Sequence, residues 1–369
     1  MTYKVLHVMR SVGPTSIPWN DLYSFSRSVK PETFLPPLII SLNKVKSSFQ
    51  KEYCNNQIRK YFRANIFSGI NYVRSIKKKH NDNNSKLILH FHAPSLFVLA
   101  LITKFFIKDV KIVFNMHSDW KHYKWYQKIG LLSFAKTSDR FVTVSNVMKT
   151  RIPKKVRNKI NVNGELISIT NGIDSNKFRI LKKSENKTDW NYKNKTTAIV
   201  AARMVPAKNY KFILKLLSMS NKIDLLIWYG DGFLRKHIEQ DIINLGLTDR
   251  IELKGLRPRN EVLKAFLNGD IYISASIWEG IGVANLEASA LGCWPFLSKI
   301  PAHDEISKNI DIETYPLNDI KSWNVSIDNY LSLTKQTQEE MRNNLSEQTL
   351  SKYNLRNTVE NYMLLYNEI

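Results

Sequence analysis

Cysteine is scarce in this sequence, because only Cys54 and Cys293 occur among its 369 residues. Two cysteines cannot form the disulfide framework of a small secreted scaffold, and their scarcity favours a reducing cytosol. The composition, with 43% hydrophobic and 24% charged residues, excludes an intrinsically disordered chain. The length is typical of two domains.

Long hydrophobic runs are also missing from the sequence. The longest one is interrupted at its ends by His90, His92 and Lys104, so it falls short of the roughly 20 residues that a membrane span needs. The apolar stretch between Lys4 and Arg10 is too short for a secretory signal and predicts a first β-strand. These features predict a cytoplasmic protein without a transmembrane segment.

Acidic residues are few in the first half of the chain. Residues 1–170 contain 29 basic and 8 acidic residues, a net charge of +21, whereas residues 171–369 contribute only +2 to the total of +23. A field of this strength attracts polyanions. Nucleic acid, an anionic membrane surface and a pyrophosphate-bearing substrate are all candidates, and a basic surface that only keeps the chain soluble remains the alternative.

What the sequence does contain is a regular alternation of short apolar, β-branched runs with amphipathic stretches. Strands are expected at 4–9, 37–42, 86–92, 111–117, 140–145, 166–172, 196–203, 222–230, 250–255, 270–276 and 293–298. Helices are expected at 97–106, 125–135, 208–219, 231–245, 259–268 and 283–291. Continuous apolar strands separated by helices predict parallel sheets covered on both faces, so the fold class is α/β.

The alternation is interrupted once, by a polar stretch without periodicity. We therefore expect an N-terminal domain at 1–174, a linker at 175–195, a C-terminal domain at 196–349 and a final helix at 350–369. Tyr353, Leu355, Val359, Tyr362 and Tyr366 form an apolar stripe at helical spacing along that final segment. Two doubly wound units place the expected site in the cleft between them, outside the carboxyl ends of the strands.

The stretch 276–296 carries the most informative residues. Gly280 and Gly282 precede an alanine-rich helix, and they let the backbone approach a ligand at a helix N-terminus, which favours anions. Glu279 lies in the turn and Glu287 one turn into the helix, where carboxylates can accept hydrogen bonds from sugar and ribose hydroxyls. A glycine turn before an ordinary helix is the alternative interpretation.

Two further clusters follow predicted strands. Arg203 and Lys208 are five residues apart after the strand at 196–203, which suits a diphosphate, since arginine offers a fork and lysine a point charge. Gly230 and Gly232 bracket Asp231 between a strand and a helix, a turn suited to a nearby ligand.

Taken in order, these motifs resemble the donor half of a family 4 glycosyltransferase of the GT-B fold. The ordered motifs are NGID (171–174), Arg-x4-Lys (203–208), GDG (230–232), the loop and helix at 255–268, and EGIGVANLEA (279–288). The resemblance implies two Rossmann-like domains facing across a cleft, with a C-terminal helix that crosses back to the first domain. It also implies retaining transfer of a sugar from a nucleotide-sugar donor.

The same resemblance implies roles for single residues. Arg203, Lys208, Glu279 and His117 would be catalytic: the two cations would bind the donor diphosphate, and Glu279 and His117 would face the donor sugar. The other donor-binding residues would be Gly230, Asp231, Leu256, Arg257, Gly280, Ile281, Gly282 and Glu287, with the base near Leu256 and Arg257 and the ribose on Glu287. A packed or capping histidine is the alternative for His117.

The first half fits the family less closely. HFHAPS (90–95) and FNMHSDW (114–120) resemble its two histidine-bearing strand ends, which brings His92 and His117 to the site. The family often has a glycine pair after the first strand, but this chain has only Gly13 followed by Pro14. We expect acceptor contacts from Gly13, Thr15, Ser16, Asn20 and His92; a proline-shaped cap before a helix is the alternative for the loop.

No cofactor or metal is expected. The sequence has no Asp-x-Asp motif, and Arg203, Lys208 and helix-terminal amides could stabilise a departing nucleotide diphosphate without a metal. The expected donor is a UDP- or GDP-sugar. The expected acceptor is a glycan, linked to polyprenyl diphosphate, in bacterial surface polysaccharide synthesis.

Basic and aromatic runs at 74–80, 121–128 and 151–159 could hold the enzyme at the inner face of the cytoplasmic membrane, although each run alone is also typical of a solvated helix face. A GT-B-like epimerase and a nucleic-acid-binding protein remain alternatives. No lysine marks a pyridoxal-phosphate site, which disfavours a phosphorylase, and no nucleic-acid-binding motif occurs.

Overall fold

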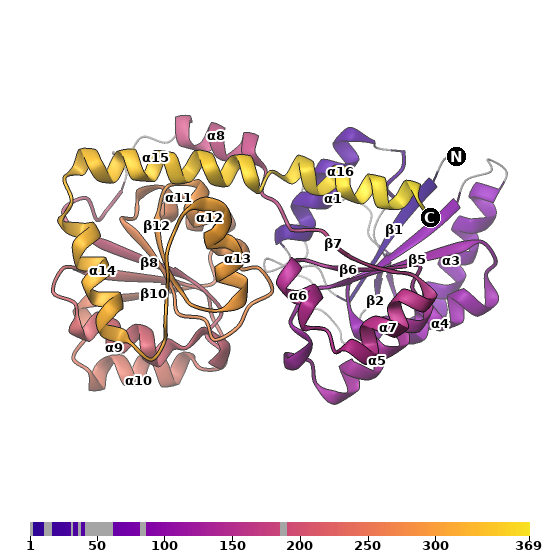
Figure 1. The fold of residues 1–369 in the computed structure, drawn as a ribbon, viewed down its shortest axis with the longest axis horizontal. Helices are drawn as coiled ribbons and strands as arrows, with labels where there is room; N and C mark the ends of the chain where they lie inside the picture. The colour runs from indigo at the N-terminus through magenta and orange to yellow at the C-terminus, as the bar shows by residue number, and fades with distance from the viewer. Residues whose placement is uncertain are drawn as a thin grey trace. The chain divides into compact units, whose positions relative to one another are not determined.

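The computed structural model describes residues 3–10, 17–30, 32–35, 38–40, 62–81, 86–184 and 190–369. The chain divides into two compact units, each built on one parallel sheet (Figure 1). Unit 1 comprises Met1–Gly172 together with Leu355–Ile369, and unit 2 comprises Ile173–Asn354. The α/β class predicted from the alternating pattern is confirmed.

Among the described residues, the sheet of unit 1 has seven parallel strands in the order β3-β2-β1-β4-β5-β6-β7. The strands are β1 (Tyr3–Met9), β2 (Leu38–Ile40), β3 (Phe62–Ala64), β4 (Lys86–Phe91), β5 (Val110–Met116), β6 (Arg140–Thr143) and β7 (Glu165–Ser168). The sequence analysis missed β3, because three residues at the edge of a sheet carry too little apolar alternation to be recognised. The other six strands overlap the predicted ranges.

Seven helices belong to unit 1 in the described part of the chain. They are α1 (Ile17–Val29), α3 (Ile66–Asn81), α4 (Phe97–Phe106), α5 (Trp125–Thr137), α6 (Asn146–Arg151), α7 (Lys154–Asn163) and α16 (Leu355–Asn367). The predicted helix at 97–106 coincides with α4, and the one at 125–135 ends two residues before α5 does.

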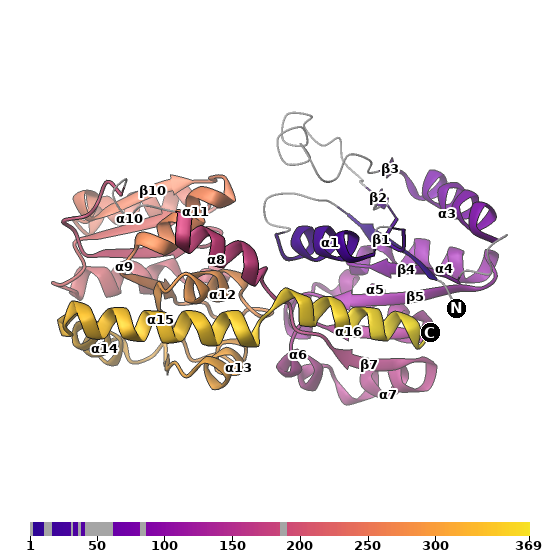
Figure 2. The same ribbon diagram turned by 90° about the horizontal axis from the view of Figure 1, so that it is seen from above.

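The last helix of the chain packs on the sheet of unit 1, beside α1 (Figures 1 and 2). Val359, Tyr362 and Tyr366 are buried in one cluster with Val5 of β1 and Ile88 of β4. Side chains of β1 at positions 3, 5 and 9 enter this cluster, as the two-residue period of a strand requires. The same face of the sheet therefore carries position 7.

The sheet of unit 2 has six parallel strands in the order β10-β9-β8-β11-β12-β13. The strands are β8 (Thr197–Ala201), β9 (Leu225–Tyr229), β10 (Ile251–Gly255), β11 (Ile271–Ser274), β12 (Trp294–Ser298) and β13 (Thr314–Tyr315). Only β13, two residues long, was not predicted. Because β8 pairs with both β9 and β11, the strand order reverses there, and ligands of such sheets bind outside the carboxyl ends at this point.

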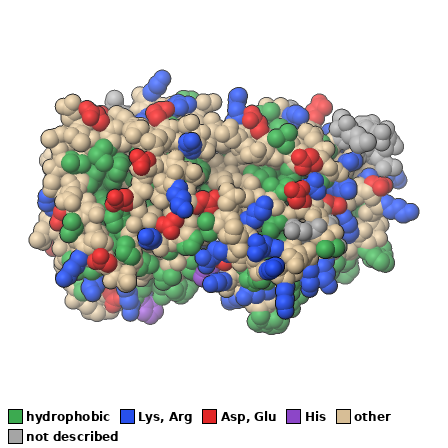
Figure 3. All heavy atoms as spheres, in the orientation of Figure 1, with side chains coloured by type: hydrophobic (Ala, Val, Ile, Leu, Met, Phe, Trp, Pro, Cys, Tyr) green, Lys and Arg blue, Asp and Glu red, His purple; other side chains and the backbone are tan. Residues whose placement is uncertain are grey.

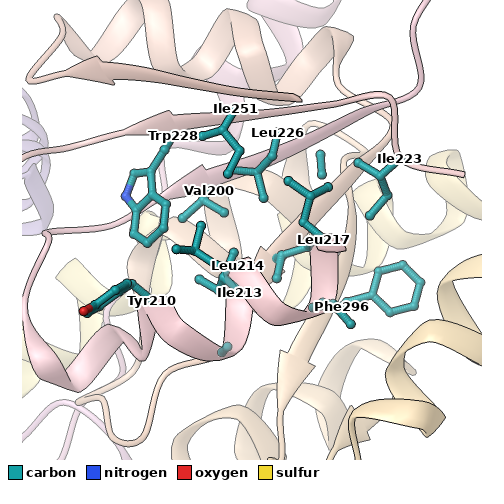
Figure 4. Packing of buried hydrophobic residues seen from close by; sticks show 14 of the residues in the cluster. Val200, Tyr210, Ile213, Leu214, Leu217, Ile223, Leu226, Trp228, Ile251 and Phe296 are labelled. Carbon is teal, nitrogen blue, oxygen red and sulfur yellow. The ribbon is translucent and has the colours of Figure 1, made fainter. Parts of the chain in front are cut away.

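Helices cover both faces of this sheet (Figure 1). They are α8 (Ser175–Ser184), α9 (Tyr210–Met219), α10 (Arg235–Asn244), α11 (Arg259–Asn268), α12 (Val283–Ala290), α13 (Pro301–Ile310), α14 (Ile320–Ser332) and α15 (Lys335–Lys352). Beneath the sheet, Val200, Leu226 and Trp228 pack against Leu214 and Leu217 of α9 (Figure 4).

Two expectations about connections are corrected. Residues 175–184 form α8 instead of an aperiodic linker, because Phe178 is buried and the Ser175 hydroxyl donates to the Leu350 carbonyl (2.7 Å). Only Ser175 and Phe178 are buried in this helix, and the sequence analysis did not detect it. At the other end, the segment expected as one helix at 350–369 is divided, since α15 continues to Lys352 and α16 begins at Leu355.

Candidate functional site

The loops that follow the strands of unit 2 are joined by backbone hydrogen bonds at the carboxyl edge of the sheet. The Met204 amide donates to the Asp231 carbonyl (3.0 Å), and the Gly230 amide donates to the Gly255 carbonyl (2.8 Å). The Ile277 amide donates to the Ala207 carbonyl (2.8 Å). Segments that the sequence analysis identified separately, at 203–208, 230–232, 255–257 and 276–282, therefore form one continuous edge.

Gly230 shows how closely these loops pack. Its φ of +124° lies in a region that side chains rarely adopt, and a Cβ there would lie 2.2 Å from the carbonyl oxygen of Ala202. The loop after β9 can approach the loop after β8 only because this residue is glycine. The glycine therefore has a structural role in shaping the edge.

Lys208 and Glu279 form an ion pair at the centre of this edge. Lys208 Nζ lies 2.9 Å from Glu279 Oε1, and the carboxylate is only 9% exposed. The Ser276 hydroxyl donates to the same oxygen (2.7 Å). Burial alone would raise the pKa of the Glu279 carboxyl, but the Lys208 ammonium, with a smaller contribution from the neighbouring His303, lowers this pKa below its ordinary value. Glu279 is therefore an anion that orients a lysine ammonium.

His303 is a residue of this cluster that the sequence analysis missed. It lies in the first turn of α13, fully buried, with Nε2 3.5 Å from Glu279 Oε1 and Nδ1 2.8 Å from the Ser298 carbonyl oxygen. Its position directly after β12 was the available signal, because the carboxyl ends of parallel strands meet at one edge. A single histidine outside any motif gave no reason to choose it.

The amino terminus of α12 lies beside Glu279. Gly282 is the N-cap residue with φ +75°, and a Cβ there would lie 2.9 Å from Glu279 Oε2 and 2.3 Å from Asn285 Nδ2. No side chain of the described residues caps this terminus. Its first amides can therefore hydrogen-bond an anion, such as the phosphate of a ligand.

Glu287 is buried one turn into α12, where it pairs with Arg259. The Arg259 guanidinium Nε donates to Glu287 Oε1 (2.9 Å), and both side chains are largely buried. The sequence analysis expected Leu256 and Arg257 in this region and missed Arg259, the first residue of α11. Leu256 presents an exposed apolar side chain, and the Arg257 guanidinium donates to the Lys254 carbonyl (3.0 Å).

The remaining donor-side residues lie on the same edge. Arg203 is exposed two residues beyond the end of β8, and Asp231 accepts a hydrogen bond from the Gly232 amide (2.7 Å). Ile281 is buried between the two glycines of the turn, Gly280 and Gly282. The edge thus combines two cations, a free helix terminus and an exposed apolar side chain, which together can bind a phosphorylated ligand.

Unit 1 brings two of the predicted residues together. His92 follows β4, His117 follows β5, and His92 Nδ1 lies 3.1 Å from His117 Nε2. Among the predicted acceptor residues, Gly13, Thr15 and Ser16 lie outside the described residues. Asn20 lies in α1, but its side chain is also outside the described part of the chain.

Two family models match the chain. The model described as Glycosyl transferases group 1 matches residues 182–351, and the model described as Glycosyltransferase Family 4 matches residues 50–177. The first covers nearly all of unit 2, and the second covers much of unit 1. The two matches follow the division of the chain into units.

Curated relatives are similar at low identity. The phosphatidylinositol N-acetylglucosaminyltransferase GPI3 subunit of Saccharomyces cerevisiae is 26% identical over 255 residues, covering 66% of this chain and 54% of that protein. The UDP-Gal:alpha-D-GlcNAc-diphosphoundecaprenol alpha-1,3-galactosyltransferase of Escherichia coli is 24% identical over 305 residues, covering 74% of both. The chain thus spans about half the length of the yeast subunit.

Among solved structures, Anabaena Alr3699/HepE in complex with UDP and glucose matches with a TM-score of 0.76 at 14% identity, covering all of both chains. At this identity the match shows a common fold.

Proposed function

Because the chain belongs to the family 4, group 1 glycosyltransferases, we propose that it transfers a sugar from a nucleotide-sugar donor to a lipid-linked glycan during the synthesis of a bacterial surface polysaccharide. The observation that carries this proposal is the Lys208–Glu279 pair at the carboxyl edge of unit 2, next to the open amino terminus of α12. A positive charge and free amides at one position suit a diphosphate. The Escherichia coli relative, a galactosyltransferase named for a diphosphoundecaprenol-linked substrate, supports the acceptor class.

The donor is a UDP-sugar in this proposal, since the similar Anabaena structure holds UDP and glucose. Lys208 and Arg203 bind the diphosphate, and the backbone amides at the amino terminus of α12 donate further hydrogen bonds to it. Glu287, held by Arg259, accepts hydrogen bonds from the ribose hydroxyls. The base lies against Leu256 and Arg257.

The chemistry follows from the charges. The bond between the sugar C1 and the diphosphate oxygen breaks, and the acceptor oxygen forms its bond to C1 on the same face, so that the configuration is retained. The acceptor proton passes to the departing phosphate oxygen. Lys208 and Arg203 stabilise the negative charge that develops on the diphosphate, and Glu279 keeps the Lys208 ammonium in position.

A membrane-associated acceptor is supported by the surface of unit 1. Phe105 at the end of α4 is 82% exposed, and Trp125 at the start of α5 is 76% exposed. Around them, Val98, Leu101, Phe106, Tyr126 and Ile129 are exposed too. No helix in the described part of the chain is long and apolar enough to cross a bilayer.

Basic side chains accompany this apolar surface. Arg74, Lys77 and Lys78 of α3 line a hollow of about 400 Å³ together with Phe106 and Lys108. Helix α4 contacts both α3 and α5. On the face of unit 1 drawn in Figure 3, further Lys and Arg side chains gather over α6 and α7. Exposed aromatic rings combined with lysines suit the interface of an anionic bilayer. We propose peripheral association with the cytoplasmic face of the membrane through α3, α4 and α5.

A direct assay tests the proposed activity. The chain is incubated with radiolabelled UDP-galactose, UDP-glucose, UDP-N-acetylglucosamine or GDP-mannose and with undecaprenyl-diphosphate-N-acetylglucosamine in vesicles, and the lipid product is counted. Transfer from one donor, abolished in Glu287→Gln, is the expected result. Absence of transfer from every donor, together with no binding of UDP, would contradict the proposal. An altered nucleotide sugar formed without acceptor would instead indicate an epimerase.

A further inference from the structure

Four histidines project from one face of the unit 1 sheet, close to the carboxyl ends of its central strands. His7 lies on β1 and is paired in register with His90 on β4. His92 follows two residues later on the same face, and His117 lies beyond the end of β5. The two-residue period of a strand places His90 and His92 side by side, and the parallel register brings His7 beside both.

The rings of three of these histidines converge. His7 Nδ1 lies 2.8 Å from His92 Nε2, and one ring nitrogen from each of His7, His90 and His92 lies within 4.8 Å of the other two. The ring centroids of His90 and His92 are 4.3 Å apart, and those of His7 and His90 are 4.9 Å apart. His7 and His90 are fully buried, and His92 is partly exposed, so an ion could reach the cluster from the His92 side.

We propose that His7, His90 and His92 form a binding site for a divalent transition-metal ion of the Zn²⁺ and Co²⁺ class. Three imidazoles are an established ligand set for such ions, with metal–nitrogen distances of about 2.0–2.1 Å and a fourth position left for water. Two nitrogens on one tetrahedral ion are separated by roughly 3.3 Å at such distances. The His7 and His92 nitrogens at 2.8 Å would therefore move apart by only about half an ångström.

The outer nitrogens of His90 and His92 have the partners that metal-binding histidines need. His90 Nδ1 lies 2.6 Å from the Tyr366 hydroxyl, and His92 Nδ1 lies 3.1 Å from His117 Nε2. A hydrogen bond at one ring nitrogen fixes the tautomer and directs the lone pair of the other towards a metal. In His90 that other nitrogen, Nε2, is fully buried and has no hydrogen-bond partner among the described residues.

One buried ring nitrogen of the cluster, His90 Nε2, would gain a partner from a bound ion. A buried nitrogen without a partner is unfavourable, and a metal ion would satisfy it.

The proposed ion joins elements that are far apart in the sequence. It would connect β1 to β4 and, through Tyr366, both strands to α16. This site uses none of the residues at the donor edge of unit 2, but its ligand His92 is also a predicted acceptor contact. The tests below therefore measure metal binding and not sugar transfer. The first expected effect of the ion is on the stability of unit 1.

Cobalt titration of the full chain, prepared without a polyhistidine tag and stripped with chelator, tests the proposal. We expect about one equivalent of Co²⁺ to bind, with the visible absorption bands of a tetrahedral site, and Zn²⁺ to displace it. Saturating Zn²⁺ should raise the melting temperature of wild type by roughly 5 °C. His90→Gln should weaken binding at least 100-fold, and Tyr366→Phe, which removes only an outer partner, about 10-fold.

His237→Gln is the matched control, since His237 is exposed on α10 in unit 2. It should bind Co²⁺ as wild type does. Wild-type protein that binds no Co²⁺ overturns the proposal even if the buried variants fail to fold. The proposal is also overturned if His90→Gln, shown to be folded by circular dichroism, binds Co²⁺ as tightly as wild type.

Discussion

Single residues at the carboxyl edge of unit 2 are held by partners of opposite charge. Glu279 holds Lys208, and Arg259 holds Glu287, so that Lys208 and Glu287 have fixed positions before a donor arrives. Pre-positioned charges stabilise a developing charge without reorganisation at the moment of reaction. The catalytic consequences of these pairs can be tested one residue at a time.

Replacing Lys208 by methionine should lower kcat about 100-fold or more. Methionine keeps an unbranched side chain of similar length but cannot stabilise the departing diphosphate. Transfer from the radiolabelled donor is the measurement. Lys211→Met is the control, because Lys211 is exposed on α9, and it should stay within twofold of wild type. Equal losses in both variants would argue against a role for Lys208.

Replacing Glu279 by glutamine should change how stability depends on pH. The folded-state pKa of Glu279 is lowered, so its ion pair stabilises the protein above the unfolded-state value of 4.5 and less as the pH falls below it. At pH 7 the variant should be less stable by about 2 kcal/mol, and the difference should narrow between pH 4.5 and pH 3. Urea unfolding of both proteins at each pH measures this.

Glu239→Gln provides the comparison for that series. Glu239 also has a basic partner, Arg235 at 2.7 Å, but the Glu239 side chain is 46% exposed on α10, against 9% for Glu279. Exposed pairs contribute little to stability. A pH-dependent difference as large in Glu239→Gln as in Glu279→Gln would show that burial of the Glu279 pair is not the cause.

At the scale of elements, the first turn of α12 depends on a left-handed residue. Gly282→Ala should destabilise unit 2 by about 1–2 kcal/mol and lower transfer about tenfold or more, because its Cβ would collide with Asn285 and press on Glu279. Gly246→Ala is the control: its φ is +66°, but nothing lies within 4 Å of the added carbon. Gly246→Ala should introduce backbone strain similar to that of Gly282→Ala but leave sugar transfer unchanged. Melting curves measure the stability, and the transfer assay measures the activity.

The last helix offers a second test at this scale. Leu365 is 3% exposed within the unit 1 core, whereas the adjacent Leu364 is 60% exposed. Leu365→Ala should destabilise unit 1 by about 2–4 kcal/mol, through lost burial and a cavity, and Leu364→Ala by less than about 0.5 kcal/mol. Denaturant unfolding distinguishes them. Equal effects would mean that α16 is not anchored to the sheet by this face.

At the scale of the whole molecule, the charge asymmetry predicts how the chain meets a membrane. Wild type should bind vesicles that contain phosphatidylglycerol. Raising the salt from 0.1 M to 0.5 M should release most of the bound protein, because salt screens the attraction between exposed charges and the anionic lipid. Replacing both Phe105 and Trp125 by serine should weaken binding about tenfold. Phe233→Ser is the control, since Phe233 is 72% exposed in unit 2. Sedimentation with the vesicles measures the binding of wild type, of the double variant and of the control.

The sequence by itself determined the α/β class, most of the strands and the loops that follow them. Apolar strands and amphipathic helices have local periods that sequence analysis can detect, and glycine turns carry recognisable spacing. The sequence analysis missed the edge strands β3 and β13, which are short. It also missed helix α8, which packs through few of its residues. The order in which parallel strands pair was not encoded in any local pattern.

Only the tertiary structure decided which side chains meet. His303 reaches Glu279, Arg259 reaches Glu287, and His7 reaches His92 across 85 positions, because parallel pairing brings the carboxyl ends of distant strands to one edge. Such contacts depend on strand order and register, which are set by the packing of the whole unit.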